Sequence, residues 1–150
     1  MPQSHVQLYS HLIFSTKNRE ALLDDAIRPK VHAYLAVLLR DLDSTFVVVG
    51  GVADHVHILF DASKFHTPVE IVEKIKKDSL KFVKTLGSEY QNFYWQRGYG
   101  LFSVGPTQRN AMETYIRNQE EHHKVKSFKD EYRDFLTRYK LPVDEHYLWD

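Results

Sequence analysis

The segment Ala53-Asp54-His55-Val56-His57-Ile58-Leu59-Phe60 decides the fold, because it places two histidines one residue apart in an otherwise apolar, β-forming run. Side chains on a β-strand alternate between its two faces, so the two imidazoles lie on one face and the apolar residues on the other. The apolar face is predicted to pack in the core and the histidine face to bind a ligand. Two parallel imidazoles form half of a divalent-metal site. A His-x-His pair is more often structural than metal-binding, so the assignment depends on other donors.

The run before the histidines, residues 44–52, is rich in β-branched residues and ends in Gly50-Gly51-Val52. A hairpin with the histidine strand is the natural interpretation. Because this run is almost wholly apolar, it is predicted to lie in the centre of the sheet.

Hydrophobic spacing predicts the remaining elements. Residues 6–15 form a first strand with His11 on the face opposite Leu12 and Phe14. A helix follows within residues 22–41 and begins near Arg28, because Pro29 suits a first turn. Thr67-Pro68-Val69-Glu70 is a capping box that opens a second helix, which ends at Gly87.

The second half of the chain is predicted to contain one strand and two helices. Residues 93–104 are aromatic and punctuated by glycine, which indicates a last strand with Trp95 and Phe102 in the core. A helix runs from Thr107 to about Lys124, and a short amphipathic helix covers residues 128–139.

Composition restricts the class of protein. A chain of 150 residues with 43% hydrophobic content and no linker fits a single domain over residues 1–150, with a C-terminal short helix and tail from about residue 126. It has no cysteine, which excludes disulfides and thiolate chemistry. The sequence shows neither a membrane-spanning run nor a signal peptide, so we expect a cytoplasmic protein. Twenty cations balance 20 acidic residues, so nucleic-acid binding would depend on local basic patches.

Tyr115 and Gln119 lie four residues apart in the predicted helix over residues 107–124, so their side chains share one face. Alone, Tyr115 is more simply a packing residue. Combined with the histidine pair, Gln119 can supply a third metal ligand and Tyr115 a nucleophile for metal-assisted phosphoryl transfer.

The motif His55-Val56-His57 followed by Tyr115-x-x-x-Gln119 resembles the HUH single-tyrosine transposases of bacterial insertion sequences, including relatives associated with repetitive extragenic palindromes. The resemblance covers nearly the whole chain. It includes residues 11–17, 95–104 and 118–123 and the ending Tyr147-Leu148-Trp149-Asp150. No position departs from the catalytic pattern.

This resemblance implies a ferredoxin-like α/β (α+β) fold, similar to RNA-recognition domains, with an antiparallel sheet, helices on one face and a separate tyrosine-bearing helix. It implies that His55, His57 and Gln119 hold one Mg²⁺ or Mn²⁺. Tyr115 would attack a phosphorus of single-stranded DNA and leave a 5′-phosphotyrosine and a free 3′-hydroxyl. Because the phosphodiester exchange is nearly balanced in bond energy, no nucleotide cofactor is expected.

The family resemblance further implies DNA hairpins at element ends as substrates and a homodimer as the assembly. Gly105-Pro106 precedes the tyrosine helix, and such a break lets the helix pack on its own sheet or on a partner's. We therefore expect composite sites, with the histidines of one chain and the tyrosine of the other. Candidate DNA contacts are six cations outside the catalytic pattern: Lys17, Arg19, Lys77, Lys81, Arg97 and Arg109.

Two other functions stay open. A non-catalytic module of the same fold would bind single-stranded nucleic acid on its sheet aromatics and leave the histidines incidental. A metal-dependent phosphodiesterase would use water as nucleophile and form no covalent protein–DNA species. A metal titration tests the first alternative, and a search for the covalent species tests the second.

Overall fold

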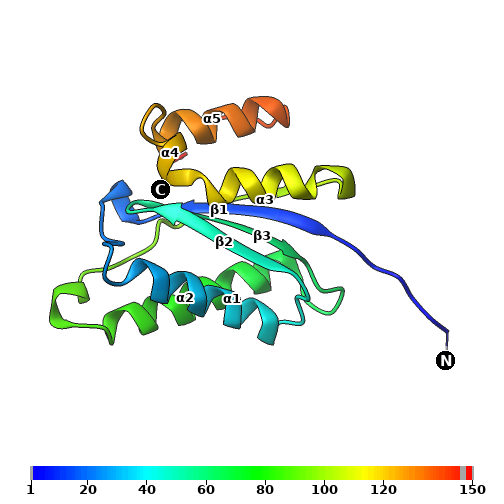
Figure 1. The fold of residues 1–150 in the computed structure, drawn as a ribbon, viewed down its shortest axis with the longest axis horizontal. Coiled ribbons are helices and arrows are strands. Elements are labelled where there is room, and N and C mark those ends of the chain that lie inside the picture. Colours follow the sequence, from blue (N-terminus) through cyan, green and yellow to red (C-terminus); the bar gives the residue numbers. More distant parts are fainter. Residues whose placement is uncertain (1, 146–147, 150) are drawn as a thin grey trace.

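A four-stranded antiparallel sheet separates two layers of helices in the computed structural model, which describes residues 2–145 and 148–149 (Figure 1). The strand order is β2-β3-β1-β4, with β1 at Tyr9–Ser15, β2 at Val47–Val52, β3 at His55–Asp61 and β4 at Gly100–Ser103. Helices follow β1 and β3, as in the ferredoxin-like β-α-β-β-α-β arrangement. The predicted fold class is confirmed.

Helices α1 (Arg28–Asp41) and α2 (Pro68–Lys84) cover one face of the sheet and bury the main core (Figure 1). As predicted, α1 begins at Arg28 with proline in its first turn. Thr67 caps α2, because its side chain accepts from the Glu70 backbone while the Glu70 side chain accepts from the Thr67 backbone. The strand side chains in this core include Leu12, Phe14, Val56, Ile58 and Phe60.

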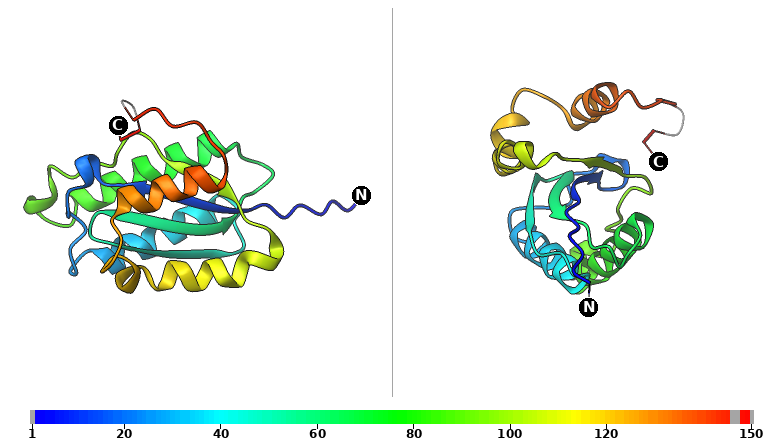
Figure 2. Two further views of the ribbon diagram at one scale, coloured as in Figure 1. Left: turned by 90° about the horizontal axis from the view of Figure 1, so that it is seen from above. Right: turned by 90° about the vertical axis from the view of Figure 1, so that its right-hand side faces the viewer.

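Helices α3 (Arg109–Arg117), α4 (Gln119–His122) and α5 (Phe128–Arg138) lie on the opposite face (Figure 2). The apolar side of α5 packs on the sheet, where Phe128 and Phe135 join Ile13 and Phe102 in a second buried cluster. The sequence predicted a histidine face open to ligands. That face is instead covered by a helical layer, because α5 carries its own apolar stripe and buries it there.

The expected central position of the strand in residues 44–52 is wrong, because β2 is an edge strand. Both faces of β2 are nevertheless covered, by α1 on one side and by α3 and α4 on the other. The apolar composition of β2 therefore reflects the burial of both its faces under helices. It does not require a neighbouring strand on both sides. The first strand is also shorter than expected, since Val6 and Leu8 precede it and stay exposed.

The predicted strand over residues 93–104 is confirmed only for its last part, β4. Before it, Trp95 makes one isolated bridge to Thr16. The Lys76 ammonium donates to the backbone carbonyls of Gln96, Arg97 and Gly98, so side-chain bonds replace strand pairing there.

The predicted continuous helix over residues 107–124 is broken. Asn118, with φ −100° and ψ 23°, separates α3 from α4. Gln119 at the start of α4 is consequently buried, with 1% of its surface exposed. None of the helices in the described part of the chain is long and apolar enough to cross a membrane.

Candidate metal and nucleophile site

The two histidines of β3 lie fully buried on the sheet face that α3, α4 and α5 cover. In the antiparallel pairing with β1, His57 is opposite Ile13 and His55 is opposite Ser15. Both imidazoles contact Glu131 of α5, so they share a face as the alternation predicted.

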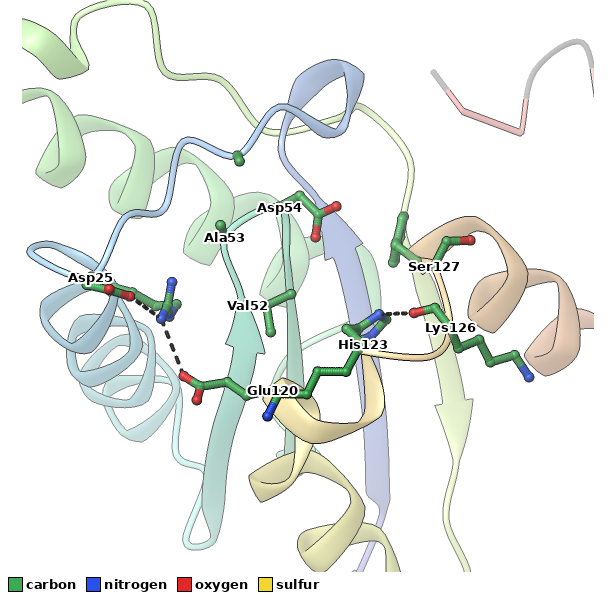
Figure 3. A pocket seen from close by; sticks show the side chains of 12 residues that line it. Asp25, Val52, Ala53, Asp54, Glu120, His123, Lys126 and Ser127 are labelled. Atoms are coloured by element: carbon green, nitrogen blue, oxygen red, sulfur yellow. Dashed lines mark hydrogen bonds and ion pairs between the residues drawn. The ribbon is translucent and has the colours of Figure 1, made fainter.

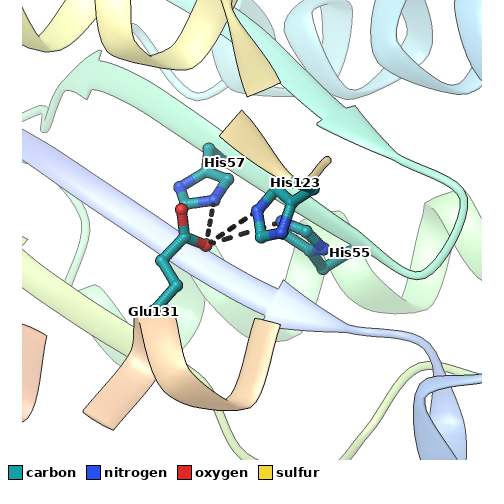
Figure 4. A group of neighbouring side chains, drawn as sticks. All are labelled: His55, His57, His123 and Glu131. Atoms are coloured by element: carbon teal, nitrogen blue, oxygen red, sulfur yellow. Dashed lines mark hydrogen bonds and ion pairs between the residues drawn. The ribbon is translucent and has the colours of Figure 1, made fainter. Parts of the chain in front are cut away.

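A carboxylate stands at the centre of this site (Figure 4). Glu131 Oε1 lies 2.9 Å from His57 Nε2, 3.6 Å from His55 Nε2 and 3.3 Å from His123 Nε2. One ligand atom from each of these four residues lies within 4.8 Å of the others. Gln119 Oε1 is beside them, 3.2 Å from His55 Nε2 and 2.9 Å from His123 Nε2. The structure thus brings together the three predicted ligands and adds His123 and Glu131.

The Nδ1 atoms of His55 and His123, which point away from Glu131, each contact a hydrogen-bond acceptor. His55 Nδ1 lies 2.7 Å from Asp54 Oδ1, and His123 Nδ1 lies 2.6 Å from the Lys126 carbonyl oxygen. A carboxylate and a carbonyl only accept, so both Nδ1 atoms carry a hydrogen. The Nε2 atoms of both rings consequently point towards the Glu131 carboxylate. Histidines that bind a metal through one ring nitrogen commonly donate the other N–H to such an acceptor, so this orientation fits a bound cation.

His11 of β1 extends the site behind His57. Its Nε2 atom lies 2.7 Å from His57 Nδ1, and the two rings stack with centroids 5.0 Å apart. Burial lowers the pKa of His57 to about 4 and also holds the pKa of His11 well below its ordinary value. Both rings are therefore neutral at neutral pH, which is the form that binds metals.

Tyr115 meets the same carboxylate from the other side. Its hydroxyl donates to Glu131 Oε2, and His122 Nε2 lies 3.2 Å from that hydroxyl. Burial and the hydrogen bond to Glu131 raise the pKa of Tyr115. Burial alone would raise the pKa of Glu131, but hydrogen bonds from His123 and His57 outweigh it and lower that pKa. Glu131 is thus an ionised carboxylate that joins the imidazoles to the phenol.

Two hollows approach this centre. A small one of about 140 Å³ is lined by Tyr115 and Glu131 together with the cations Lys126 and Arg138. A wider cleft of about 620 Å³ has Asp54, His123 and Lys126 on its wall (Figure 3). Tyr115 and the imidazole cluster can therefore be approached from two sides.

Three of the predicted DNA contacts lie together near the end of β1. Lys17 and Arg97 line one pocket with Tyr94 and Trp149. Arg19 stacks on Trp149, with its guanidinium carbon 5.6 Å from the ring centroid. Tyr147 and Asp150 of the family-like ending lie outside the described residues.

The other three cations lie elsewhere. Lys77 and Lys81 are exposed on α2, which covers the face opposite the histidines (Figure 1). Arg109 donates to the Tyr9 hydroxyl at 3.0 Å, and its guanidinium stacks on the Phe46 ring. Its side chain therefore fixes the start of α3 to neighbouring aromatic residues. The structure does not bring these residues to the cluster.

Sequence reasoning missed four polar members of the site: His11, His122, His123 and Glu131. One signal was available for Glu131. It shares the apolar stripe of an amphipathic helix with Phe128, Tyr132 and Phe135, and a carboxylate on such a stripe needs a partner when buried.

The comparisons with known proteins concern both sequence and fold. The family model described as IS200-like transposase matches residues 4–119. A solved protein of Deinococcus radiodurans R1, described as a candidate transposase, is 23% identical with a TM-score of 0.61, over 79% of this chain and 98% of its own. A REP-associated tyrosine transposase, solved bound to a REP hairpin, is 13% identical with a TM-score of 0.60, over 82% of this chain and 73% of its own.

At these identities the two solved structures show a common fold. None of the curated proteins matches the chain significantly. The family model, however, spans more than half of the chain. The protein belongs to the family of IS200-like transposases.

Proposed function

We propose that this transposase cleaves and rejoins single-stranded DNA through a covalent bond between Tyr115 and a 5′-phosphate, at a centre that holds one divalent metal ion. The observation that carries the proposal is Glu131, whose two oxygens face the histidine cluster and the Tyr115 hydroxyl respectively. A nucleophile next to a buried set of metal ligands is what metal-assisted phosphoryl transfer needs.

His55, His57 and Gln119 would hold the ion, which we expect to be Mg²⁺ or Mn²⁺. The donor set fits, because neutral imidazoles and an amide oxygen meet there beside a carboxylate. A bound divalent ion would supply positive charge that polarises the scissile phosphate. The functional unit is taken as the single domain of residues 1–150, α5 included, because α5 carries Glu131.

In the proposed reaction the Tyr115 oxygen forms a bond to phosphorus and the bond from phosphorus to the 3′-oxygen breaks. Glu131 Oε2, which already accepts from the phenol, takes the proton of Tyr115. The departing 3′-oxygen takes up a proton from water and becomes a free hydroxyl. Attack of a 3′-hydroxyl on the phosphotyrosine then breaks the bond between the Tyr115 oxygen and phosphorus, and the Tyr115 oxygen regains a proton as the DNA is rejoined. Lys126 and Arg138 line the hollow beside Tyr115 and would offer positive charge to a phosphodiester there, next to the carboxylates of Glu131 and Asp134.

For the substrate we propose DNA hairpins at element ends, a choice supported by family membership and by the REP hairpin bound to the solved relative. For the assembly we propose a homodimer. In the single chain the Tyr115 ring lies 5.8 Å from the ring of its own His57. This distance supports a site formed within one chain, in place of the composite site expected from the sequence.

The test is a covalent adduct assay. Single-stranded hairpin DNA is incubated with the protein and Mn²⁺ and resolved on a denaturing gel. The adduct should form with the natural chain and with Tyr132→Phe, a matched control on α5, and should be absent with Tyr115→Phe. Metal and DNA binding with no adduct or cleavage would favour the non-catalytic binding module. Cleavage without an adduct would favour the phosphodiesterase.

A further inference from the structure

We propose that His123 and Glu131 are ligands of the same metal centre, which then holds three imidazoles, one amide oxygen and one carboxylate. This inference rests on the proposed function and extends its ligand set by two residues. Neither residue belongs to the motif that the sequence presented.

His123 is oriented as a ligand. Its Nδ1 atom donates to the Lys126 carbonyl, which leaves Nε2 as the ring atom that points to Gln119 Oε1, 2.9 Å away, and to Glu131 Oε1, 3.3 Å away. His55 has the same arrangement, with Asp54 as the fixed acceptor. Metal-binding histidines commonly donate their second N–H to a carboxylate or carbonyl, which fixes the ring.

Glu131 is positioned as the anionic ligand. Its side chain is 2% exposed, and its Oε1 atom lies between 2.9 and 3.6 Å from three imidazole nitrogens. Donors that bind one ion at about 2.1 Å lie about 3.0 to 3.4 Å apart when they are neighbours. The three distances from Glu131 Oε1 bracket this range, and the ligand atoms of all four residues lie within 4.8 Å of one another, so an ion would draw the side chains closer together.

The extended set predicts which ion binds best. Imidazole nitrogen suits first-row transition metals, whereas Mg²⁺ prefers oxygen and retains its waters. A centre with three imidazoles should therefore bind Mn²⁺ more tightly than Mg²⁺, and Co²⁺ more tightly still. Of the two ions expected above, Mg²⁺ and Mn²⁺, the extended ligand set therefore favours Mn²⁺.

The extended set also predicts that the ion ties three segments together. His55 and His57 belong to β3, His123 follows α4 and Glu131 belongs to α5. A ligand that binds only the folded chain raises its stability in proportion to the logarithm of its concentration. Mn²⁺ should therefore raise the Tm of the natural chain, and less so when Glu131 is replaced.

The experiment measures Mn²⁺ affinity by isothermal titration calorimetry for the full chain and for His123→Gln, Glu131→Gln and His57→Gln. The controls are His66→Gln and Glu121→Gln, which change a partly buried loop imidazole outside the cluster and an exposed α4 carboxylate. We expect Kd to rise at least about tenfold in each of the three site variants and to stay unchanged in the controls. Circular dichroism checks that each variant is folded.

Pulsed electron paramagnetic resonance on Mn²⁺ bound to the natural chain counts coordinated imidazoles without depending on any variant. Three are expected, and two would overturn the assignment of His123. If His57→Gln weakens binding while His123→Gln and Glu131→Gln bind like the natural chain, this inference fails and the proposed metal function stands. If the natural chain binds no divalent ion, the metal part of the proposed function fails as well.

Discussion

Gly50 of β2 lies directly beneath the backbone of Ile116 in α3. A Cβ atom added to Gly50 would stand 2.3 Å from the Ile116 carbonyl oxygen and 2.7 Å from its Cγ2 atom. Ile116 follows Tyr115 in the chain, so this close approach fixes the distance between the Tyr115 backbone and the sheet. Glycine is needed here because no side chain fits between the strand and the helix.

Replacing Gly50 with alanine should push α3 away from β2 and displace Tyr115. Overpacking of this kind costs about 1–3 kcal/mol of unfolding free energy. Urea denaturation measures the loss, and the adduct assay should show slower DNA cleavage. Gly105→Ala is the matched control, because an added Cβ there meets nothing within 4 Å. Natural activity and stability in Gly50→Ala would contradict the contact.

His57→Gln should destabilise the metal-free chain, although the sequence predicted that the core lies on the other face of this strand. His57 is fully buried, and its loss disrupts the hydrogen bonds to His11 and Glu131. An unpaired buried polar group costs about 1–3 kcal/mol. Chemical denaturation without metal provides the measurement. The loop variant His66→Gln, whose side chain is 27% exposed, should change stability by less than about 0.5 kcal/mol. An equally small effect in His57→Gln would show that the site tolerates the loss.

Stability without metal should fall as the pH drops from about 6.5 towards 4. Burial lowers the pKa of His32 and of His57 to about 4 in the folded chain, so the unfolded chain binds more protons in this window. Each such histidine contributes a slope of up to about 1.4 kcal/mol per pH unit. His123 opposes them, because hydrogen bonding to Glu131 raises its pKa despite burial. Urea titrations at several pH values measure the slope.

His32→Gln isolates part of this effect without touching the candidate ligands. The stability of the variant should depend less steeply on pH between about 6.5 and 4 than that of the natural chain. Superimposable pH profiles would indicate that His32 titrates normally.

Lys17→Ala should weaken single-stranded DNA binding, whereas Lys77→Ala should have little effect. Lys17 follows β1, whose end at Ser15 is paired with His55, and it lies in a pocket with Tyr94 and Arg97. Lys77 projects from α2 on the far side of the sheet. Loss of one phosphate contact reduces the slope of log binding constant against log salt concentration by about 0.7 for single strands. Fluorescence anisotropy at several salt concentrations tests this, and a larger loss in Lys77→Ala would locate the DNA on the other face.

Mixing inactive His57→Ala chains with inactive Tyr115→Phe chains should not restore cleavage. The structure joins both residues within one chain, so each chain of a mixed dimer would still carry one lesion. Native mass spectrometry confirms subunit exchange, and the adduct assay measures activity. Recovery of activity after exchange would show that the tyrosine helix serves the partner's histidines.

Local patterns in the sequence determined much of the fold. Alternation along residues 53–60 predicted that His55 and His57 share a face, and helical spacing predicted that Tyr115 and Gln119 lie together. The Gln119 amide nitrogen is indeed 3.3 Å from the Tyr115 carbonyl oxygen, although the helix breaks between them. These predictions succeeded because strand and helix periodicity are properties of the local backbone.

Only the tertiary structure decided what surrounds those residues. It buried the histidines under α5, made β2 an edge strand and brought Glu131 to His57 across 74 positions of sequence. His123 and Glu131 carry no spacing relation to the histidine pair that local geometry could detect. Their positions follow from how the apolar stripes of α3 and α5 pack on one face of the sheet, and that packing depends on contacts between distant segments.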